Sequence, residues 1–158
     1  RQMRYQDMEE GFDNHDIPDP EPIISLETQL ERQQNVTIKR ILLYRMHADL
    51  SRYLTQFFGG YRKMAMTKSA IERYQQAEVL AWELNQAHQV VLRLALSQAT
   101  FYYEQMNSVE FAIKFTASAL IQAKNSMAAF TRNPKTTQKD IEMTTQVLEI
   151  LQENLKRW

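Results

Sequence analysis

Residues 89–106 read QVVLRLALSQATFYYEQM, and this stretch decides the fold class. Its apolar side chains lie on nearly all sides of a helix, as expected for a helix that is buried at the centre of a protein. The stretch contains neither Gly nor Pro, and Asn107-Ser108 follows it as a break. We therefore expect other helices to pack around this segment.

Helical spacing of apolar residues recurs on both sides of this segment. Gly59-Gly60 predicts the end of a preceding helix, Asn133-Pro134 ends a following one, and Thr136 or Thr137 caps the last. No stretch of useful length alternates with a period of two. We predict an all-α protein, an antiparallel array of helical hairpins. The further helices are expected at about residues 37–58, 61–86, 108–130 and 137–158.

Composition limits the class of protein. The chain has 158 residues, enough for one domain with a real core, with 44% apolar and 24% charged residues and no Cys. The absence of Cys removes disulfides and thiolate metal sites. No apolar run is long enough to span a membrane, and no signal sequence is apparent. We expect a cytoplasmic protein with no nucleic-acid or membrane partner.

The zero net charge conceals an asymmetry between two parts of the chain. Residues 1–36 carry nine Asp/Glu against three Lys/Arg, whereas residues 37–158 carry ten against sixteen. Pro18, Pro20 and Pro22 favour an extended segment within the acidic part, and residues 23–34 fit a short amphipathic helix. We expect an acidic leader at 1–36 and a five-helix region at 37–158, whose positive charge suits an anionic ligand.

Catalytic chemistry has little support. The three His residues lie far apart, and no Gly-rich phosphate loop or metal-binding His pair is present. Asp49 and Glu104 are better interpreted as salt-bridge partners than as an acid–base pair. We expect no catalytic residues, no metal site and no cofactor.

The helix around residue 50 contains a candidate phosphate site. Arg45 and Arg52 are seven residues apart and share one helix face, and Tyr53 follows the second. Asp49 lies between them at spacings that allow it to hold both guanidinium groups. Guanidinium groups donate paired hydrogen bonds to phosphate oxygens, although a salt-bridged solvent face explains the same pattern.

Two mixed strips could line a groove for a peptide. One strip, on the last helix, combines apolar residues, an amide and an indole, and the other, on the central helix, combines a Leu with two hydroxyls. Such a surface would bind a peptide backbone, although packing in the core explains each strip equally well. The strips consist of Val147, Ile150, Asn154 and Trp158, and of Leu96, Ser97 and Thr100.

Three ordered stretches resemble the 14-3-3 family. Residues 45–54 (RMHADLSRYL) are similar to the family's fifth helix with its Asp-x-x-Arg-Tyr-Leu pattern. Residues 94–104 (LALSQATFYYE) are similar to its seventh helix, with the Phe-Tyr-Tyr-Glu hallmark intact and the helix-breaking turn after it. Residues 151–158 (LQENLKRW) match its ninth helix.

The resemblance implies an adaptor that binds phosphoserine or phosphothreonine segments of client proteins in an amphipathic groove. Arg52 and Tyr53 would hold the phosphate, with Arg45 in place of a family lysine, and Asn154 would hold the peptide backbone. Ser97 stands where the family has an asparagine, so it offers a shorter contact. The apolar wall would consist of Leu96, Thr100, Val147, Ile150 and Trp158.

The sequence departs from the family at its front. The family has four preceding helices, which form the dimer interface and add two cations to the phosphate pocket. Residues 1–36 show no convincing counterpart, although residues 23–34 fit a remnant of the fourth helix. These helices are lost, have diverged or lie outside this sequence. We expect weaker phosphate binding, and a monomer or an unusual homodimer. The acidic leader could itself occupy the basic groove, and a helical scaffold without phosphate dependence is the alternative function.

Overall fold

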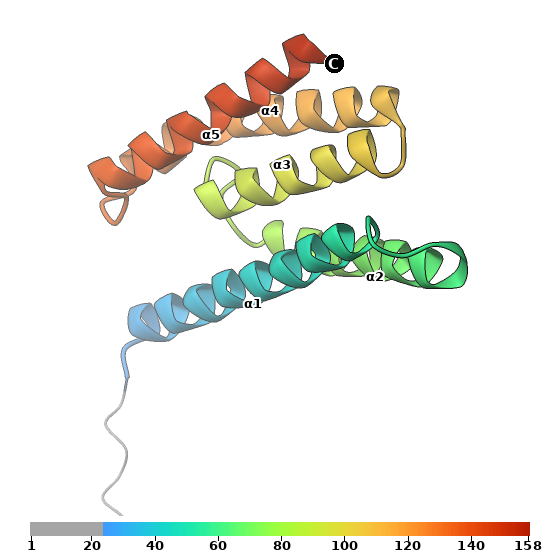
Figure 1. Cartoon of the computed structure of the whole chain (residues 1–158). Helices are drawn as coiled ribbons and strands as arrows, with labels where there is room; N and C mark the ends of the chain where they lie inside the picture. The colour runs from blue at the N-terminus through green and yellow to red at the C-terminus, as the bar shows by residue number, and fades with distance from the viewer. Residues whose placement is uncertain (1–23) are drawn as a thin grey trace, which may run out of the picture.

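The computed structural model describes residues 24–158 as a bundle of five α-helices (Figure 1). Residues 24–158 contain no strand, so the predicted all-α class is confirmed. The predicted extended segment around Pro18 to Pro22 lies outside the described residues. The helices are α1 (Leu26–Leu54), α2 (Gly60–Ala81), α3 (Gln89–Glu104), α4 (Val109–Arg132) and α5 (Gln138–Arg157).

The helix α3 lies at the centre and contacts all four other helices. Figure 1 shows α1 and α2 side by side on one side of α3, with α4 and α5 on the other. Half of the 16 residues of α3 are buried, among them Phe101, Leu92 and Leu94. The prediction of a central buried helix at this position is confirmed. Because α3 borders both α1 and α5, it places side chains from three helices around one surface.

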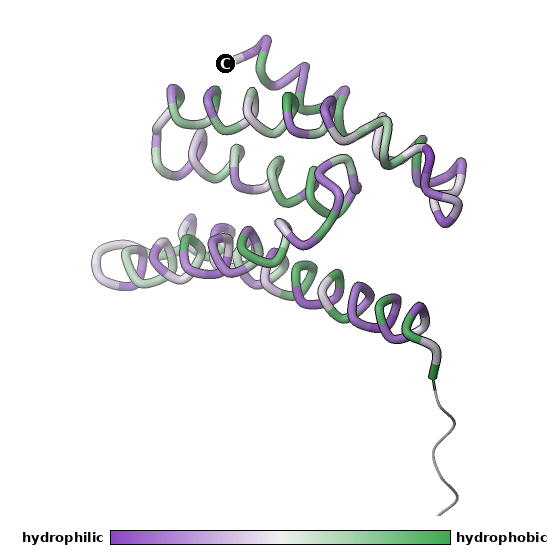
Figure 2. The backbone as a smooth tube through the Cα atoms, turned by 180° about the vertical axis from the view of Figure 1, so that it is seen from behind, coloured by the Kyte–Doolittle hydropathy of each residue, from purple (hydrophilic) through white to green (hydrophobic). Residues whose placement is uncertain are grey.

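The first helix is longer at its start than predicted. Residues 26–34 of the expected short helix and the helix expected from Thr37 form one 29-residue helix, whose first turn is capped by the Ser25 hydroxyl. The predicted boundary between residues 36 and 37 therefore lies inside α1. Figure 2 shows hydrophilic and hydrophobic turns alternating along α1, as expected for a helix with one face on α2.

The Gly59-Gly60 pair marks a helix start rather than a helix end. The helix α1 already ends at Leu54, and Gly59 is the N-cap of α2. Gly60 has a φ of +53°, a conformation that costs Gly less than other residues. The pair therefore allows a tight reversal, which sets α2 against α1.

The last helix begins as predicted. The Thr137 hydroxyl accepts a hydrogen bond from the backbone N–H of Asp140, whose carboxylate accepts one from the backbone N–H of Thr137. This reciprocal capping box fixes the first turn of α5. Ser108 lies at the N-cap of α4 as predicted, but its side chain makes no capping hydrogen bond.

Candidate functional site

A groove of about 380 Å³ lies where α1, α3 and α5 meet. It collects six of the residues that the sequence singled out, which come from three helices distant in sequence. Its walls are partly charged and partly apolar, as a peptide-binding surface requires. The lining residues are Arg45 and Asp49 of α1, Arg93, Leu96 and Ser97 of α3, and Gln146, Val147 and Ile150 of α5.

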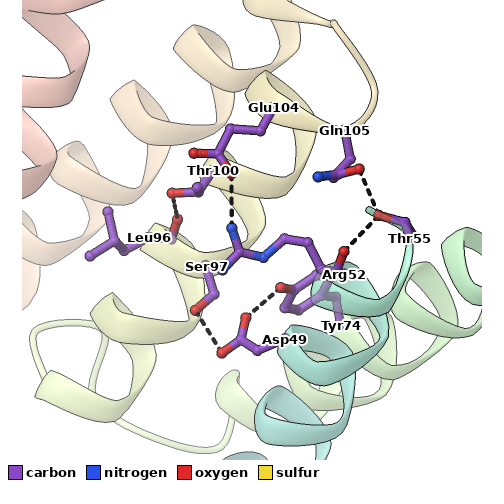
Figure 3. Close-up of polar contacts among 9 residues, drawn as sticks. All are labelled: Asp49, Arg52, Thr55, Tyr74, Leu96, Ser97, Thr100, Glu104 and Gln105. Carbon is purple, nitrogen blue, oxygen red and sulfur yellow. Dashed lines mark hydrogen bonds and ion pairs between the residues drawn. The ribbon is translucent and has the colours of Figure 1, made fainter. Parts of the chain in front are cut away.

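Arg52 lies beside this groove and is held by the chain itself. Its Nη1 donates a hydrogen bond to Oε2 of Glu104 over 3.0 Å, which joins α1 to α3 (Figure 3). The guanidinium also lies 4.9 Å from the ring centroid of Tyr53. The side chain of Arg52 is only 13% exposed, so this face of α1 is not an open solvent surface.

Asp49 serves as a junction of hydrogen bonds rather than as the partner of both arginines. It accepts a 2.6 Å hydrogen bond from the Tyr74 hydroxyl and a 3.4 Å one from Ser97 (Figure 3). Its carboxylate lies 3.9 Å from Nε of Arg45. The prediction that Asp49 holds Arg52 as well was wrong, because the Arg52 guanidinium extends away from it towards α3.

The surroundings of Tyr74 explain why Asp49 is fixed in place. Burial raises the pKa of Tyr74, and the hydrogen bond to Asp49 and the negative charge of that carboxylate raise it further. The positive charges of Arg52 and Arg45 act in the opposite direction. The phenol is therefore a permanent donor at neutral pH, and it holds one carboxylate oxygen at the base of the site.

The two arginines carry unused donors. The Nε atoms of Arg45 and Arg52 are buried, and no residue in the described part of the chain accepts a hydrogen bond from them. Covering a cation costs free energy unless it is paired and hydrogen-bonded. The side chain of Arg45 is 20% exposed and lines the groove, so an oxyanion in the groove could approach its charge.

The remaining predicted residues differ in their placement. Tyr53 is 55% exposed on α1, and the Thr100 hydroxyl donates to the backbone oxygen of Leu96. Asn154 is half-buried on α5, and its side chain forms no hydrogen bond with residues 24–158. The Trp158 ring stacks on Tyr103 with centroids 4.9 Å apart. None of these four lines the groove.

Val147 and Ile150 lie on the same strip of α5 but in different environments. Val147 is 4% exposed and belongs to a core cluster with Leu92, Ala123 and Leu151. Ile150 is 44% exposed. Val147 therefore lines the groove and also packs in the core. Ile150 faces the open part of the groove.

Sequence reasoning missed Arg93 and Gln146, which line the groove, and it did not identify Arg52 as the partner of Glu104. The spacing held a signal for Arg93, which precedes Leu96 by three residues and Ser97 by four. Glu104 was predicted only as a salt-bridge partner. Its partner could not be named, because that depends on how α1 and α3 face each other.

Other classes of site find no support in residues 24–158. No group of three His, Asp or Glu side chains is placed to hold a metal ion in this part of the chain. His47 is exposed, His88 caps α3, and His15 lies outside the described residues. None of the helices in residues 24–158 combines the length and the apolar content that crossing a bilayer requires.

Comparisons with known proteins agree on one family. The model of the family described as "14-3-3 protein" matches residues 21–158. A 14-3-3 protein of Giardia intestinalis is 30% identical over 119 residues, which are 75% of this chain and 46% of the relative. Protein BMH2 of Saccharomyces cerevisiae is 32% identical over 120 residues, 75% of this chain and 42% of the relative.

A 14-3-3-like protein of Spinacia oleracea is 28% identical over 134 residues, which are 84% of this chain and 58% of the relative. The chain thus spans about half the length of the curated relatives that it matches. The match covers all five described helices, including the three that line the groove.

Proposed function

Because this chain belongs to the 14-3-3 family, we propose that it is an adaptor that binds client segments carrying phosphoserine or phosphothreonine. The phosphate binds beside Arg52 and Tyr53, Arg45 adds positive charge further along α1, and the rest of the segment lies along the groove between α3 and α5. The protein acts by binding its client rather than by catalysis. The same proposal places the adaptor in the cytoplasm.

The observation that carries the proposal is the pair of covered arginines on α1. Arg45 and Arg52 both lie next to Asp49 and Tyr74, and each has a buried Nε–H without an acceptor in residues 24–158. A surface that needed arginines only for solubility would leave them exposed. Each guanidinium group suits an anionic group of a ligand, because phosphate and carboxylate oxygens accept paired hydrogen bonds.

The opposite wall suits the rest of a peptide. Leu96 and Ile150 supply apolar surface, and Ser97 and Gln146 supply hydrogen-bonding groups within the same groove. Asn154 lies one turn beyond Ile150 on α5 and has a free amide among the described residues. An amide with both donors and acceptors suits a peptide backbone that arrives in an extended form.

One contact favours a second candidate function, a helical scaffold without phosphate dependence. Glu104 already neutralises Arg52 at 3.0 Å, so an anion must share or displace that carboxylate. A scaffold would use the apolar wall of the groove and leave this ion pair intact. The two functions therefore differ in whether Arg52 takes part in binding.

The test compares a fluorescent peptide carrying phosphoserine with its unphosphorylated form in anisotropy titrations. We expect tighter binding of the phosphorylated form, because each charge-assisted hydrogen bond contributes about 1.5–3 kcal/mol. Arg52→Gln should remove most of the difference. Arg132→Gln, the same change at an exposed position in the last turn of α4, is the matched control.

Two outcomes separate the candidates. Equal affinity for both peptides contradicts the proposed adaptor function. If, in addition, binding survives Arg52→Gln but fails with Ile150→Asp, the scaffold is supported instead. Thermal melting of each variant, followed by circular dichroism, excludes loss of fold as the cause.

A further inference from the structure

Arg93 adds a cation to the groove at a place where no acidic side chain of residues 24–158 neutralises it. It is an exposed residue of α3 and lines the same groove as Arg45. No carboxylate in residues 24–158 lies within ion-pair distance of it, whereas Arg52 is paired with Glu104 at 3.0 Å. Asp49 is the only acidic residue among those that line the groove.

The register of α1 against α3 places Arg45 and Arg93 at the same end of the groove. Asp49 contacts Ser97 and, further along both helices, Arg52 contacts Glu104 (Figure 3). The two helices therefore run in the same direction. Arg45 precedes Asp49 by four residues and Arg93 precedes Ser97 by four, so both arginines lie one turn before the same contact.

The charge at this end of the groove is only partly compensated. Asp49 lies 3.9 Å from Nε of Arg45, but its carboxylate also accepts hydrogen bonds from Tyr74 and Ser97. The groove lining thus holds two guanidinium groups against one carboxylate that is already engaged. This excess favours a negative group of a ligand at this position.

The distance between Arg45 and Arg52 along α1 can be compared with the length of an extended peptide. Arg45 and Arg52 are seven residues apart on α1, which corresponds to about 10 Å along the helix axis. An extended peptide covers about 10 Å in three residues. A phosphoserine at the Arg52 end would therefore place a side chain three residues away beside Arg45 and Arg93.

We infer that Arg93, together with Arg45, forms a second anion position in the groove, which selects phosphopeptides with a carboxylate three residues from the phosphoserine. This inference rests on the proposed function and specifies which client segments fit the site. Arg93 is the residue that sets this preference, because Arg45 is partly neutralised by Asp49.

The experiment uses residues 1–158 and a set of synthetic peptides with an otherwise uncharged sequence, each made with phosphoserine and with unmodified serine. Glu or the isosteric Gln is placed three residues before or three residues after the phosphoserine, because the direction of the peptide is part of the question. We expect one of the two Glu peptides to bind about fivefold more tightly than its Gln partner at low salt.

Variants of the protein identify the cation. Arg93→Gln should abolish the preference for Glu, and Arg93→Glu should transfer it to a peptide with Lys at the same position. Arg132→Gln removes the same charge outside the groove and should leave the preference unchanged. Because Arg93 is exposed, the thermal melting of its variants should match that of the parent.

The outcomes distinguish this inference from the proposed function. Tighter binding of phosphorylated peptides with equal affinity for Glu and Gln at both positions would overturn the inference alone, as would a Glu preference that persists in Arg93→Gln. A Glu preference without any preference for phosphoserine would overturn the proposed function and leave the role of Arg93 standing. Absence of binding by every peptide would contradict both.

Discussion

Arg52 of α1 and Glu104 of α3 form an ion pair with a 3.0 Å hydrogen bond, which joins the two helices beside the groove. The glutamate side chain is 49% exposed, whereas that of the arginine is 13% exposed. The cation proposed to bind phosphate is thus already engaged, and its partner is the more accessible member of the pair. A phosphate must compete with this carboxylate or share Arg52 with it.

Glu104→Gln should therefore strengthen phosphopeptide binding. The substitution keeps an acceptor for Arg52 but removes the negative charge that repels the phosphate. We expect affinity to rise about fivefold, since charge pairs at partly exposed positions contribute at most about 1 kcal/mol. Titration with the phosphoserine peptide measures the change.

The control is Glu110→Gln, which removes the same charge from an exposed pair with Lys114 on α4, outside the groove. Its affinity should equal that of the parent. Weaker binding by Glu104→Gln would mean that the carboxylate positions Arg52 for the ligand rather than competes with it.

Local sequence signals predicted the helices of this chain well. The apolar run at residues 89–106 identified the buried helix, because its apolar side chains lie on nearly all sides, and Thr137 marked the start of α5. The resemblance to the 14-3-3 family was confirmed. The residues that this resemblance assigns to phosphate and peptide binding stay predictions.

Contacts between helices could not be predicted in the same way. Asp49 has suitable spacing for both arginines on α1, so the sequence favoured it as their common partner. The true partner of Arg52 lies 52 residues away on α3, and only the packing of the two helices brings it close. Arg93 was not predicted for a related reason. Its spacing to Leu96 and Ser97 indicates a shared site only once these residues of α3 are known to line a groove.

Tyr74→Phe should lower stability without unfolding the protein. The Tyr74 ring is 2% exposed, and its hydroxyl donates to Asp49 over 2.6 Å. Removing the hydroxyl costs about 1 kcal/mol, since water can replace it at the partly exposed carboxylate. For a chain of this size the melting temperature should fall by about 2–4 °C.

Circular dichroism melting of Tyr74→Phe measures this change. Tyr61→Phe is the matched control, because the Tyr61 side chain is 91% exposed and its hydroxyl lies in solvent. An unchanged melting temperature for Tyr74→Phe would show that the hydrogen bond to Asp49 contributes nothing to the folded state.

The stability of the protein should fall when the pH drops below about 6.5 through the titration of His88. Burial lowers the pKa of His88 from its ordinary value of 6.5, although the charge of Asp140 opposes the shift. The unfolded chain then binds more protons than the folded chain below that pH, so acid favours unfolding. Protonation also removes the Nδ1 acceptor that caps the backbone N–H of Val90.

Urea unfolding at pH 7.5, 6.5 and 5.5 tests this prediction. His88→Asn keeps a capping acceptor but cannot titrate in this range, so its free energy of unfolding should decline less than that of the parent. Equal declines would assign the pH dependence to other groups.

Ile150→Asp and Val147→Asp should separate the groove from the core. Both residues line the groove, but Val147 is 4% exposed and packs in the core, whereas Ile150 is 44% exposed. A carboxylate at Val147 would be buried without a partner, so that variant should unfold or lose more than about 3 kcal/mol of stability. At Ile150 the carboxylate reaches solvent, and circular dichroism should show an intact fold. Ile150→Asp should nevertheless weaken phosphopeptide binding about tenfold, because the groove loses apolar surface and gains a negative charge close to the ligand. Unchanged peptide affinity in a folded Ile150→Asp variant would place the ligand elsewhere on the protein, since a segment lying between α3 and α5 cannot avoid this side chain.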